Sequence, residues 1–170
     1  MQLRLEPLPS LFIVALIATA TIAAAWAFQV FGGYAPCPLC LQQRWPYYAA
    51  IPLALVLLGW RSRSPHAVRA GLLLVALIML AGAGLALYHA GIEWQWWPGP
   101  QACAAGSALS GALPDLANAR VIRCDEAPWR FMGLSFAGWN GAISLLIAAI
   151  ALNGARQRSP EGSSSVSQSR

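Results

Sequence analysis

Long apolar runs alternate with shorter polar segments along this chain. The four runs that are long enough to span a membrane lie at about 11–31, 41–60, 68–90 and 134–152. At about 1.5 Å per helical residue, each run covers the roughly 30 Å of a bilayer's hydrocarbon core. Apolar and polar residues do not alternate within the runs, as they would in a barrel strand, so the pattern predicts helices. We expect an all-α fold in which four transmembrane helices form one bundle.

The polar segments between these runs set the domain organisation. The first and second runs are joined by a short loop at 32–40, and the third and fourth by a long loop at about 91–133. The Ser-rich tail at 154–170 is polar throughout, which is typical of disordered chain. The sequence therefore predicts a single membrane domain over residues 1–153, followed by a disordered tail.

The composition supports a membrane protein and excludes two other classes. Of the 170 residues, 58% are hydrophobic and 10% are charged, whereas about a quarter of a soluble domain is charged. A soluble domain of this size would expose too much apolar surface, and a disordered chain would be more polar. The net charge of +5 forms no stripe along one predicted element, so we expect no nucleic-acid partner.

The basic residues predict the orientation in the membrane. Seven of the 11 flank the runs on one side: Arg4, Arg61, Arg63, Arg69, Arg156, Arg158 and Arg170. Because basic residues concentrate on the cytoplasmic side, both termini are expected in the cytoplasm. The loops at 32–40 and 91–133 then face the periplasm of a bacterial inner membrane. An alternative for the first run is a cleaved signal peptide, with small residues at 23–25 as the cleavage site.

All four cysteines lie in the two predicted periplasmic loops, where disulfides persist. Cys37 and Cys40 form a Cys-x-x-Cys motif before the second run, and Cys103 and Cys124 lie in the long loop. Three interpretations compete: a zinc cage, two structural disulfides, or a redox-active pair with a partner pair. The wide spacing of the second pair disfavours zinc, and we expect no metal. A two-residue spacer closes a small, strained ring, which favours a reactive disulfide.

An arginine lies next to the Cys-x-x-Cys motif. Arg44 follows Cys40 by four residues, so on a helix both share one face, about 6 Å apart along the axis. The guanidinium keeps its charge, and the helix N-terminus also stabilises a thiolate. A cation is costly at membrane depth, and such residues usually have a functional partner. A thiolate beside a fixed cation at this depth suits a quinone, so the residues predict a membrane dithiol oxidoreductase.

The chain resembles the bacterial disulfide-bond-formation protein B family, the DsbB-type quinone reductases, over about residues 10–152. The motifs that carry the resemblance are Cys37-Pro38-Leu39-Cys40 followed by Gln43-Arg44, Cys103, and Cys124 followed by Trp129, Phe131, Gly133, Leu134, Ser135 and Trp139-Asn140. The resemblance implies an enzyme that reoxidises a periplasmic thioredoxin-fold dithiol of the DsbA type. Its electrons would pass through two cysteine pairs to the membrane quinone pool, with ubiquinone or menaquinone as the acceptor.

The resemblance also implies roles for single residues. Cys103 matches the cysteine that forms a mixed disulfide with the DsbA-like partner, and Cys124 matches its loop partner. Cys37 and Cys40 match the pair that reduces quinone, with Cys40 as the thiolate that forms a charge-transfer complex or adduct with the ring. Arg44 matches the arginine that supports quinone binding.

Several other residues carry weaker predictions. His89 is a candidate for the quinone-linked histidine of the family, but an interfacial or packed histidine is an equally good interpretation. Glu93 is interpreted as a solvated loop acid, and Asn140 as an interhelical hydrogen-bond donor. Gly82 and Gly84 predict close helix packing. Pro46, like Pro52, could kink the second helix or simply be tolerated there.

Two other functions remain open on the sequence. One is a vitamin-K-epoxide-reductase-like enzyme, which also couples cysteine pairs to quinone but places its close-spaced pair late in the bundle. The other is a non-catalytic membrane scaffold with two structural disulfides. The scaffold predicts an unreactive Cys40 and tolerance of Arg44→Lys, whereas the enzyme predicts a loss of activity because an ammonium does not reproduce a guanidinium.

Overall fold

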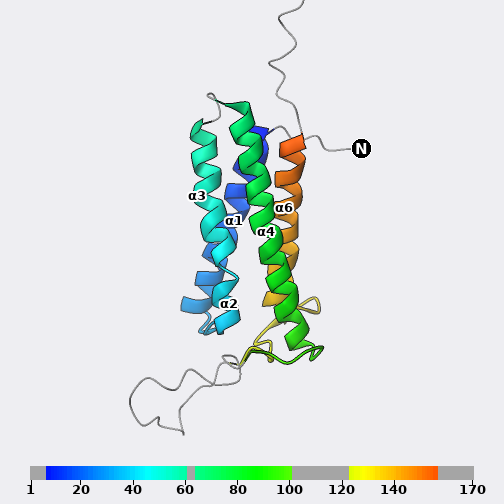
Figure 1. The fold of residues 1–170 in the computed structure, drawn as a ribbon. Coiled ribbons are helices and arrows are strands. Elements are labelled where there is room, and N and C mark those ends of the chain that lie inside the picture. Colours follow the sequence, from blue (N-terminus) through cyan, green and yellow to red (C-terminus); the bar gives the residue numbers. More distant parts are fainter. Residues whose placement is uncertain (1–6, 61–63, 101–122, 157–170) are drawn as a thin grey trace, which may run out of the picture.

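Four long helices lie side by side in the computed structural model of this protein (Figure 1), which describes residues 7–60, 64–100 and 123–156. The long helices are α1 (Pro7–Val30), α3 (Trp45–Trp60), α4 (Pro65–Glu93) and α6 (Phe136–Arg156). A short helix, α2 (Pro38–Gln42), precedes α3. Helix α1 packs against α3 and α6, and α4 packs against the same two helices. The predicted helical bundle is therefore present in the described part of the chain.

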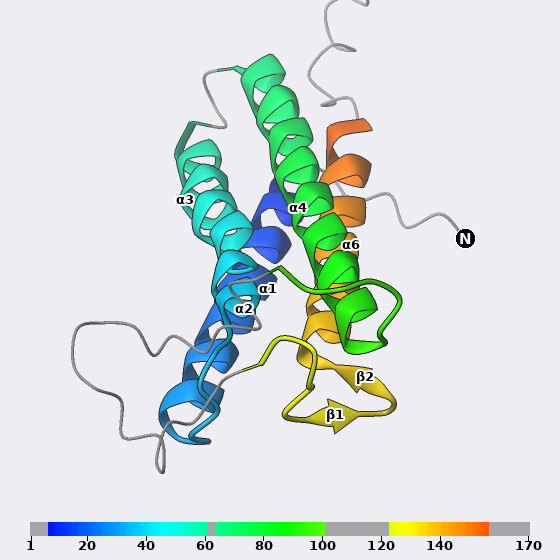
Figure 2. The same cartoon turned by 60° about the horizontal axis from the view of Figure 1, so that its bottom comes forward.

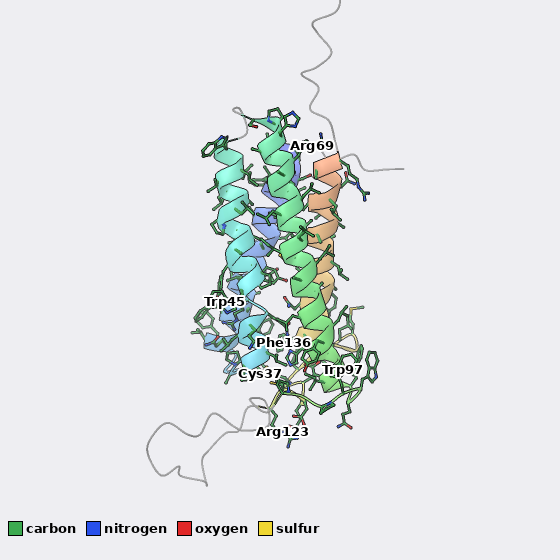
Figure 3. All side chains as sticks on the ribbon, viewed as in Figure 1. Cys37, Trp45, Arg69, Trp97, Arg123 and Phe136 are labelled. Atoms are coloured by element: carbon green, nitrogen blue, oxygen red, sulfur yellow. The ribbon has the colours of Figure 1, made fainter. Side chains whose placement is uncertain are left out.

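The two ends of the bundle differ in what they carry. The start of α1, the end of α3, the start of α4 and the end of α6 lie together at the upper end in Figure 1. Helix α2, the end of α4 and a small hairpin gather at the opposite end, which Figure 2 turns toward the viewer. Figure 3 labels Cys37 and Phe136 there and Arg69 near the other end. This arrangement brings the motif residues to one end of the bundle.

The helices have the length and surface of membrane helices. Within the described residues, α1, α4 and α6 are long and apolar enough to cross a bilayer. Large apolar side chains point outward from them and from α3, as with Phe12, Leu55, Leu77 and Leu146. Small residues such as Ala50, Ala54 and Ala76 fill the interior together with leucine and valine. The chain is thus a multi-pass membrane protein with a tightly packed apolar core.

The predicted second run at 41–60 is not one helix. It is divided into α2 and the 16-residue α3, and α3 alone is shorter than the usual membrane span. Pro46 explains the break, because in a continuous helix its ring would clash with the carbonyl of Gln42. Pro52, by contrast, lies inside α3 without ending it.

A glycine on α4 allows a close approach to the start of α3. A Cβ atom at Gly82 would lie 2.9 Å from the Pro46 side chain, closer than real contacts allow, whereas one at Gly84 would meet nothing within 4 Å. The prediction of close packing is confirmed for Gly82 and wrong for Gly84. Gly82 therefore sets the distance between α4 and the break that follows α2.

A hairpin precedes α6 and was not predicted. Its strands are β1 (Arg130–Phe131) and β2 (Leu134–Ser135), paired antiparallel. Met132 and Gly133 both have positive φ, as a two-residue hairpin turn requires. The all-α prediction misses these strands, and the fourth run starts at Phe136 instead of Leu134. At its other end α6 continues to Arg156, beyond the predicted domain boundary at residue 153; residues 157–170 lie outside the described chain.

Candidate functional site

The two cysteines of the Cys-x-x-Cys motif lie at the start of α2. Cys37 caps this helix, because its Sγ accepts a hydrogen bond from the backbone N–H of Cys40 at 3.1 Å. Pro38 follows as the first helical residue, where its missing N–H costs nothing. The two Sγ atoms lie 2.8 Å apart, and Cys37 is buried while Cys40 is partly exposed. The local sequence thus folds the motif into a turn that holds both sulfurs together.

One side of this pair faces Cys124, in the segment between α4 and α6. Cys37 packs with Leu39, Ile92 and Cys124 in a buried cluster that is separate from the main core. Cys124 is disulfide-bonded, whereas Cys37 and Cys40 are free thiols in this structure. Cys103, the predicted partner of Cys124, lies outside the described residues. The structure therefore brings three of the predicted site residues to one end of the bundle.

His89 lies on this same side of the pair. It is buried on α4, and its Nε2 is 3.7 Å from Cys37 Sγ and 3.2 Å from the carbonyl oxygen of Cys124. Glu93, one turn later, places Oε1 4.0 Å from Nε2. Glu93 is 9% exposed, so its interpretation as a solvated loop acid is wrong: it is the buried last residue of α4. His89 connects the two cysteine centres.

A series of hydrogen-bonded polar side chains leads from the interior of the bundle to His89. Gln43 Nε2 lies 2.6 Å from His89 Nδ1, and Gln43 Oε1 accepts a hydrogen bond from Asn140 Nδ2 at 2.7 Å. Tyr47 donates to Asn140 Oδ1 at 2.7 Å and lies 3.0 Å from the Ser144 hydroxyl. This confirms the prediction that Asn140 is an interhelical hydrogen-bond donor. The remaining members could not be found from the sequence, because only packing brings α3, α4 and α6 together.

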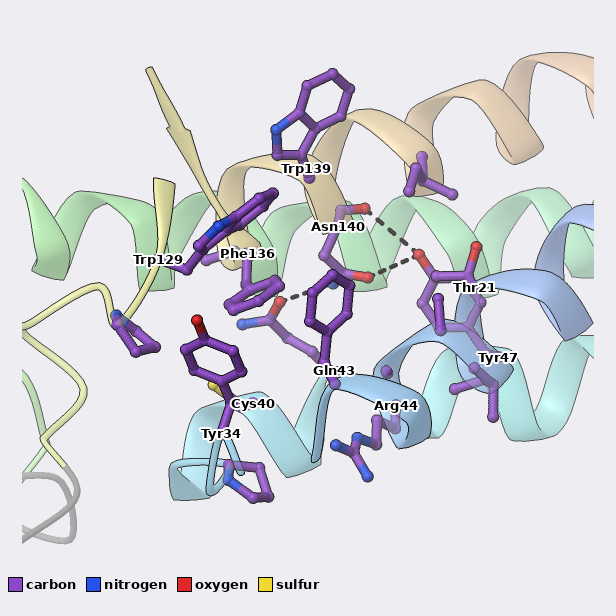
Figure 4. Close-up of a pocket in the computed structure, with 18 of the residues that line it drawn as sticks. Thr21, Tyr34, Cys40, Gln43, Arg44, Tyr47, Trp129, Phe136, Trp139 and Asn140 are labelled. Carbon is purple, nitrogen blue, oxygen red and sulfur yellow. Dashed lines mark hydrogen bonds between the residues drawn. The ribbon is translucent and has the colours of Figure 1, made fainter. Parts of the chain in front are cut away.

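The other side of the pair faces a cavity of about 430 Å³ (Figure 4). Cys40 lies on its wall, and neither Cys37 nor His89 does. Aromatic rings from α1, the first loop and α6 line much of the remainder. Phe136 makes edge contacts with Phe28 and Tyr34 and stacks on Trp129, with ring centroids 5.1–5.9 Å apart. The cavity is therefore an apolar, aromatic space that reaches one of the two sulfurs.

Arg44 places a positive charge at the cavity wall. It lies in the break between α2 and α3 and is only 8% exposed. The three ion pairs among the described residues involve other groups, so no carboxylate neutralises this guanidinium there. Its Cζ lies 5.2 Å from the ring centroid of Trp26, in cation–π contact. A buried cation without an anionic side-chain partner favours a ligand that is negative or becomes so.

The surroundings of the two thiols shift their pKa values in opposite directions. The hydrogen bond that Cys37 shares with the Cys40 thiol lowers the pKa of Cys37 well below its ordinary value, and the hydrogen bond with His89 lowers it further. Burial acts in the opposite direction but is the weaker effect. The same shared hydrogen bond, together with burial, raises the pKa of Cys40. In the free dithiol, Cys37 therefore loses the first proton.

The sulfurs of Cys37 and Cys40 and a ring nitrogen of His89 lie within 4.8 Å of one another. Such a set could hold a soft metal ion in the dithiol form. It differs from the four-cysteine cage considered for the sequence, because Cys124 is already in a disulfide.

The fold and the site together define a membrane-embedded thiol–disulfide oxidoreductase. Comparison with known families then gives the particular one: residues 8–153 match the family "Disulfide bond formation protein DsbB", and the chain belongs to this family. The family match favours the first of the three functions considered for the sequence. The protein is accordingly a disulfide-forming oxidoreductase.

Curated relatives agree with this assignment. A disulfide bond formation protein B of Marinobacter nauticus is 32% identical over 150 residues, which covers 82% of this chain and 86% of the relative. Proteins of the same description from Verminephrobacter eiseniae and Aromatoleum aromaticum are each 31% identical, over 88% and 71% of this chain and 90% and 75% of their own. No solved structure gives a significant match.

Proposed function

We propose that this protein oxidises the dithiol of a periplasmic thioredoxin-fold protein of the DsbA type and transfers the electrons to a membrane quinone. Cys103 and Cys124 form the pair that meets the partner, and Cys37 and Cys40 form the pair that meets the quinone. The four long helices span the bacterial inner membrane, with both termini in the cytoplasm. The observation that carries the proposal is the position of the Cys37–Cys40 pair, between the Cys124 cluster and the aromatic cavity.

The cavity fits a quinone ring. Its wall offers aromatic faces for stacking, and it is of the size of small-ligand sites, which are about 300–1,000 Å³. Arg44 supplies a buried positive charge for the oxygens of the ring, whichever of ubiquinone or menaquinone is used. A quinone bound there supplies an acceptor for two electrons. Cys40 is the sulfur on the cavity wall, so it is the residue through which electrons leave the pair.

The loop side fits the preceding exchange. Cys124 and Cys37 share a buried cluster, so a thiolate released in the loop pair has the Cys37–Cys40 disulfide as a neighbour. Attack on Cys37 forms one S–S bond and breaks another, and the electron pair leaves on Cys40. Cys40 then holds the charge at the wall of the cavity that Arg44 also lines. In this order, Cys37 reacts on the loop side, which it faces, and Cys40 reacts on the cavity side.

The test is quinone consumption by the purified protein in detergent. Reduced thioredoxin-fold dithiol and a short-chain quinone are supplied, and quinone absorbance is followed for the wild type, Cys40→Ser and Cys124→Ser. We expect turnover in the wild type and loss of turnover in both variants. A single turnover of the pre-reduced Cys124→Ser protein should still consume quinone, because its Cys37–Cys40 pair is intact. Steady turnover by Cys40→Ser would refute the proposed route.

A further inference from the structure

Five polar side chains connect the interior of the bundle to Cys37. They come from the break after α2 and from α3, α4 and α6, and the side chains on the cavity side are visible in Figure 4. The series, in spatial order, is Ser144, Tyr47, Asn140, Gln43 and His89, with contacts of 3.0, 2.7, 2.7 and 2.6 Å. Ser144, Tyr47, Gln43 and His89 are buried. The burial of four of the five members shields most of the series from water.

The hydrogen bonds in this series all point in one direction. The Tyr47 hydroxyl has one proton, which it donates to Asn140 Oδ1. This places the Asn140 amide nitrogen against Gln43, where it donates to Oε1. Gln43 then presents its own amide nitrogen, which can only donate, to His89. His89 Nδ1 must therefore be the acceptor, and the ring proton is on Nε2.

The opposite side of the ring agrees with this assignment. His89 Nε2 lies 3.2 Å from the Cys124 carbonyl oxygen, which can only accept a hydrogen bond. It also lies 3.7 Å from Cys37 Sγ and 4.0 Å from a carboxylate oxygen of Glu93. Each of these three neighbours accepts hydrogen bonds, Cys37 most strongly as a thiolate. Both sides of the imidazole therefore favour the Nε2–H form.

We propose that Asn140, acting through Gln43, is a positioning residue that sets the tautomer of His89, so that the neutral ring donates Nε2–H to Cys37 and to the Cys124 carbonyl. This inference rests on the proposed function, because it assigns His89 to the exchange between the two cysteine pairs instead of to the quinone. His89 holds the loop carbonyl beside the sulfur that Cys124 attacks. It stabilises the Cys37 thiolate without carrying a charge of its own.

The proposal makes an unusual prediction for Asn140→Asp. A carboxylate cannot donate to Gln43 Oε1, so the Gln43 amide must rotate and donate to the new acid. Gln43 then presents Oε1 to His89, which requires a proton on Nδ1. A substitution about one helix diameter away is therefore expected to move a proton from one face of the imidazole to the other.

Nitrogen-15 NMR of histidine measures this directly. His66 is exposed at the start of α4, and in a His66→Gln background the only remaining histidine is His89. In a pH titration followed up to the point where the ring is neutral, Nδ1 should then resonate in the unprotonated range. Asn140→Asp should move this signal to the protonated range. Tyr47→Phe, which removes the hydroxyl that orients Asn140, should give both forms.

Tyr88→Phe is the matched control. It removes a phenol hydroxyl from the residue next to His89, but Tyr88 stacks on Trp97 and is not a member of the series. This variant should leave the Nδ1 signal unchanged. A protonated Nδ1 in the wild type, or an unprotonated one in folded Asn140→Asp, would overturn the proposal.

A second readout links the tautomer to sulfur chemistry. The ratio of thiolate to thiol at Cys37, followed by ultraviolet absorbance of the reduced protein at fixed pH, should fall about tenfold in Asn140→Asp, because a donor to the thiolate is lost. An unchanged ratio would contradict the assigned role. Neither readout requires quinone: if quinone turnover fails while both hold, the proposed function is wrong and the tautomer assignment stands.

Discussion

The two sides of the Cys37–Cys40 pair have different chemical surroundings. On the cavity side, Cys40 shares the cavity wall with aromatic rings and a buried guanidinium. On the loop side, Cys37 meets an imidazole, a backbone carbonyl and the Cys124 cluster. One side stabilises charge with a permanent cation, and the other with a hydrogen-bond donor. Only two residues stand between these cysteines, yet their sulfurs have separate tasks.

This difference explains how a small bundle can direct electrons. An exchange reaction proceeds toward the sulfur that leaves most easily, and the environment of each sulfur decides which one leaves. A fixed cation near the cavity favours charge on Cys40 once Cys37 is engaged in a mixed disulfide. In the free dithiol, by contrast, the neighbours favour charge on Cys37. The preferred site of charge thus changes with the state of the pair.

The largest expected effect is the separation of the two thiols in the reduced protein. Because the pKa of Cys37 is lowered and that of Cys40 is raised, the pair should ionise in two widely spaced steps. At a pH below about 8.5, the ordinary thiol value, one thiolate should already be present. It should persist as the pH falls, until the lowered pKa of Cys37 is reached. Thiolate absorbance of a Cys103→Ser/Cys124→Ser double variant measures these steps.

Single substitutions identify the sulfur responsible. Cys37→Ala in the same background should remove the step at low pH and leave Cys40 to ionise alone. The comparison between the two sides is wrong if Cys40→Ala removes the low step while Cys37→Ala preserves it.

The sequence predicted the ingredients of the cavity side better than those of the loop side. Arg44 follows Cys40 by four residues, and both line the cavity, although α2 ends at Gln42 and the two do not share one helix face as the spacing predicted. His89 and Gln43 are 46 residues apart and meet only because α4 packs beside the break after α2. Nothing in their local sequence indicates that contact. The burial of Glu93 was missed for the same reason, since its cover comes from distant chain.

In the fold, too, features with a long local sequence pattern were predicted and features without one were missed. Apolar run length predicted the helices, and the proline positions indicated where the second run could be interrupted. The two-residue strands before α6 have too little pattern to be recognised. Their turn depends on Gly133, which was noted as part of a motif and not as a hairpin residue.

Arg44→Lys should have the next largest effect and should act on the cavity side alone. An ammonium is a compact point charge and lacks the planar fork of donors, so the KM for quinone should rise about tenfold. The thiolate steps of Cys37 should be unchanged. Steady-state kinetics with a short-chain quinone measures the first quantity. Arg156→Lys, an exposed position in the last turn of α6, is the matched control and should behave as the wild type.

An equal rise of KM in both arginine variants would point to a general effect of the substitution. An unchanged KM in Arg44→Lys would remove the guanidinium from the quinone site and favour the scaffold interpretation of this position.

The smallest expected effect concerns the packing of α4 against the start of α3. Gly82→Ala would force its methyl group against Pro46, at the start of α3, and should destabilise the protein by about 1–3 kcal/mol. Gly84→Ala, two residues further on the same helix, meets open space and should be neutral or slightly stabilising, because alanine favours helix. Thermal unfolding in detergent, measured for both variants beside the wild type, gives the difference.

If Gly84→Ala is as destabilising as Gly82→Ala, the cost comes from α4 itself and not from its contact with α3. If only Gly82→Ala is destabilising, and quinone kinetics change with it, the α3–α4 contact is what holds Gln43 and Arg44 in place at the cavity wall.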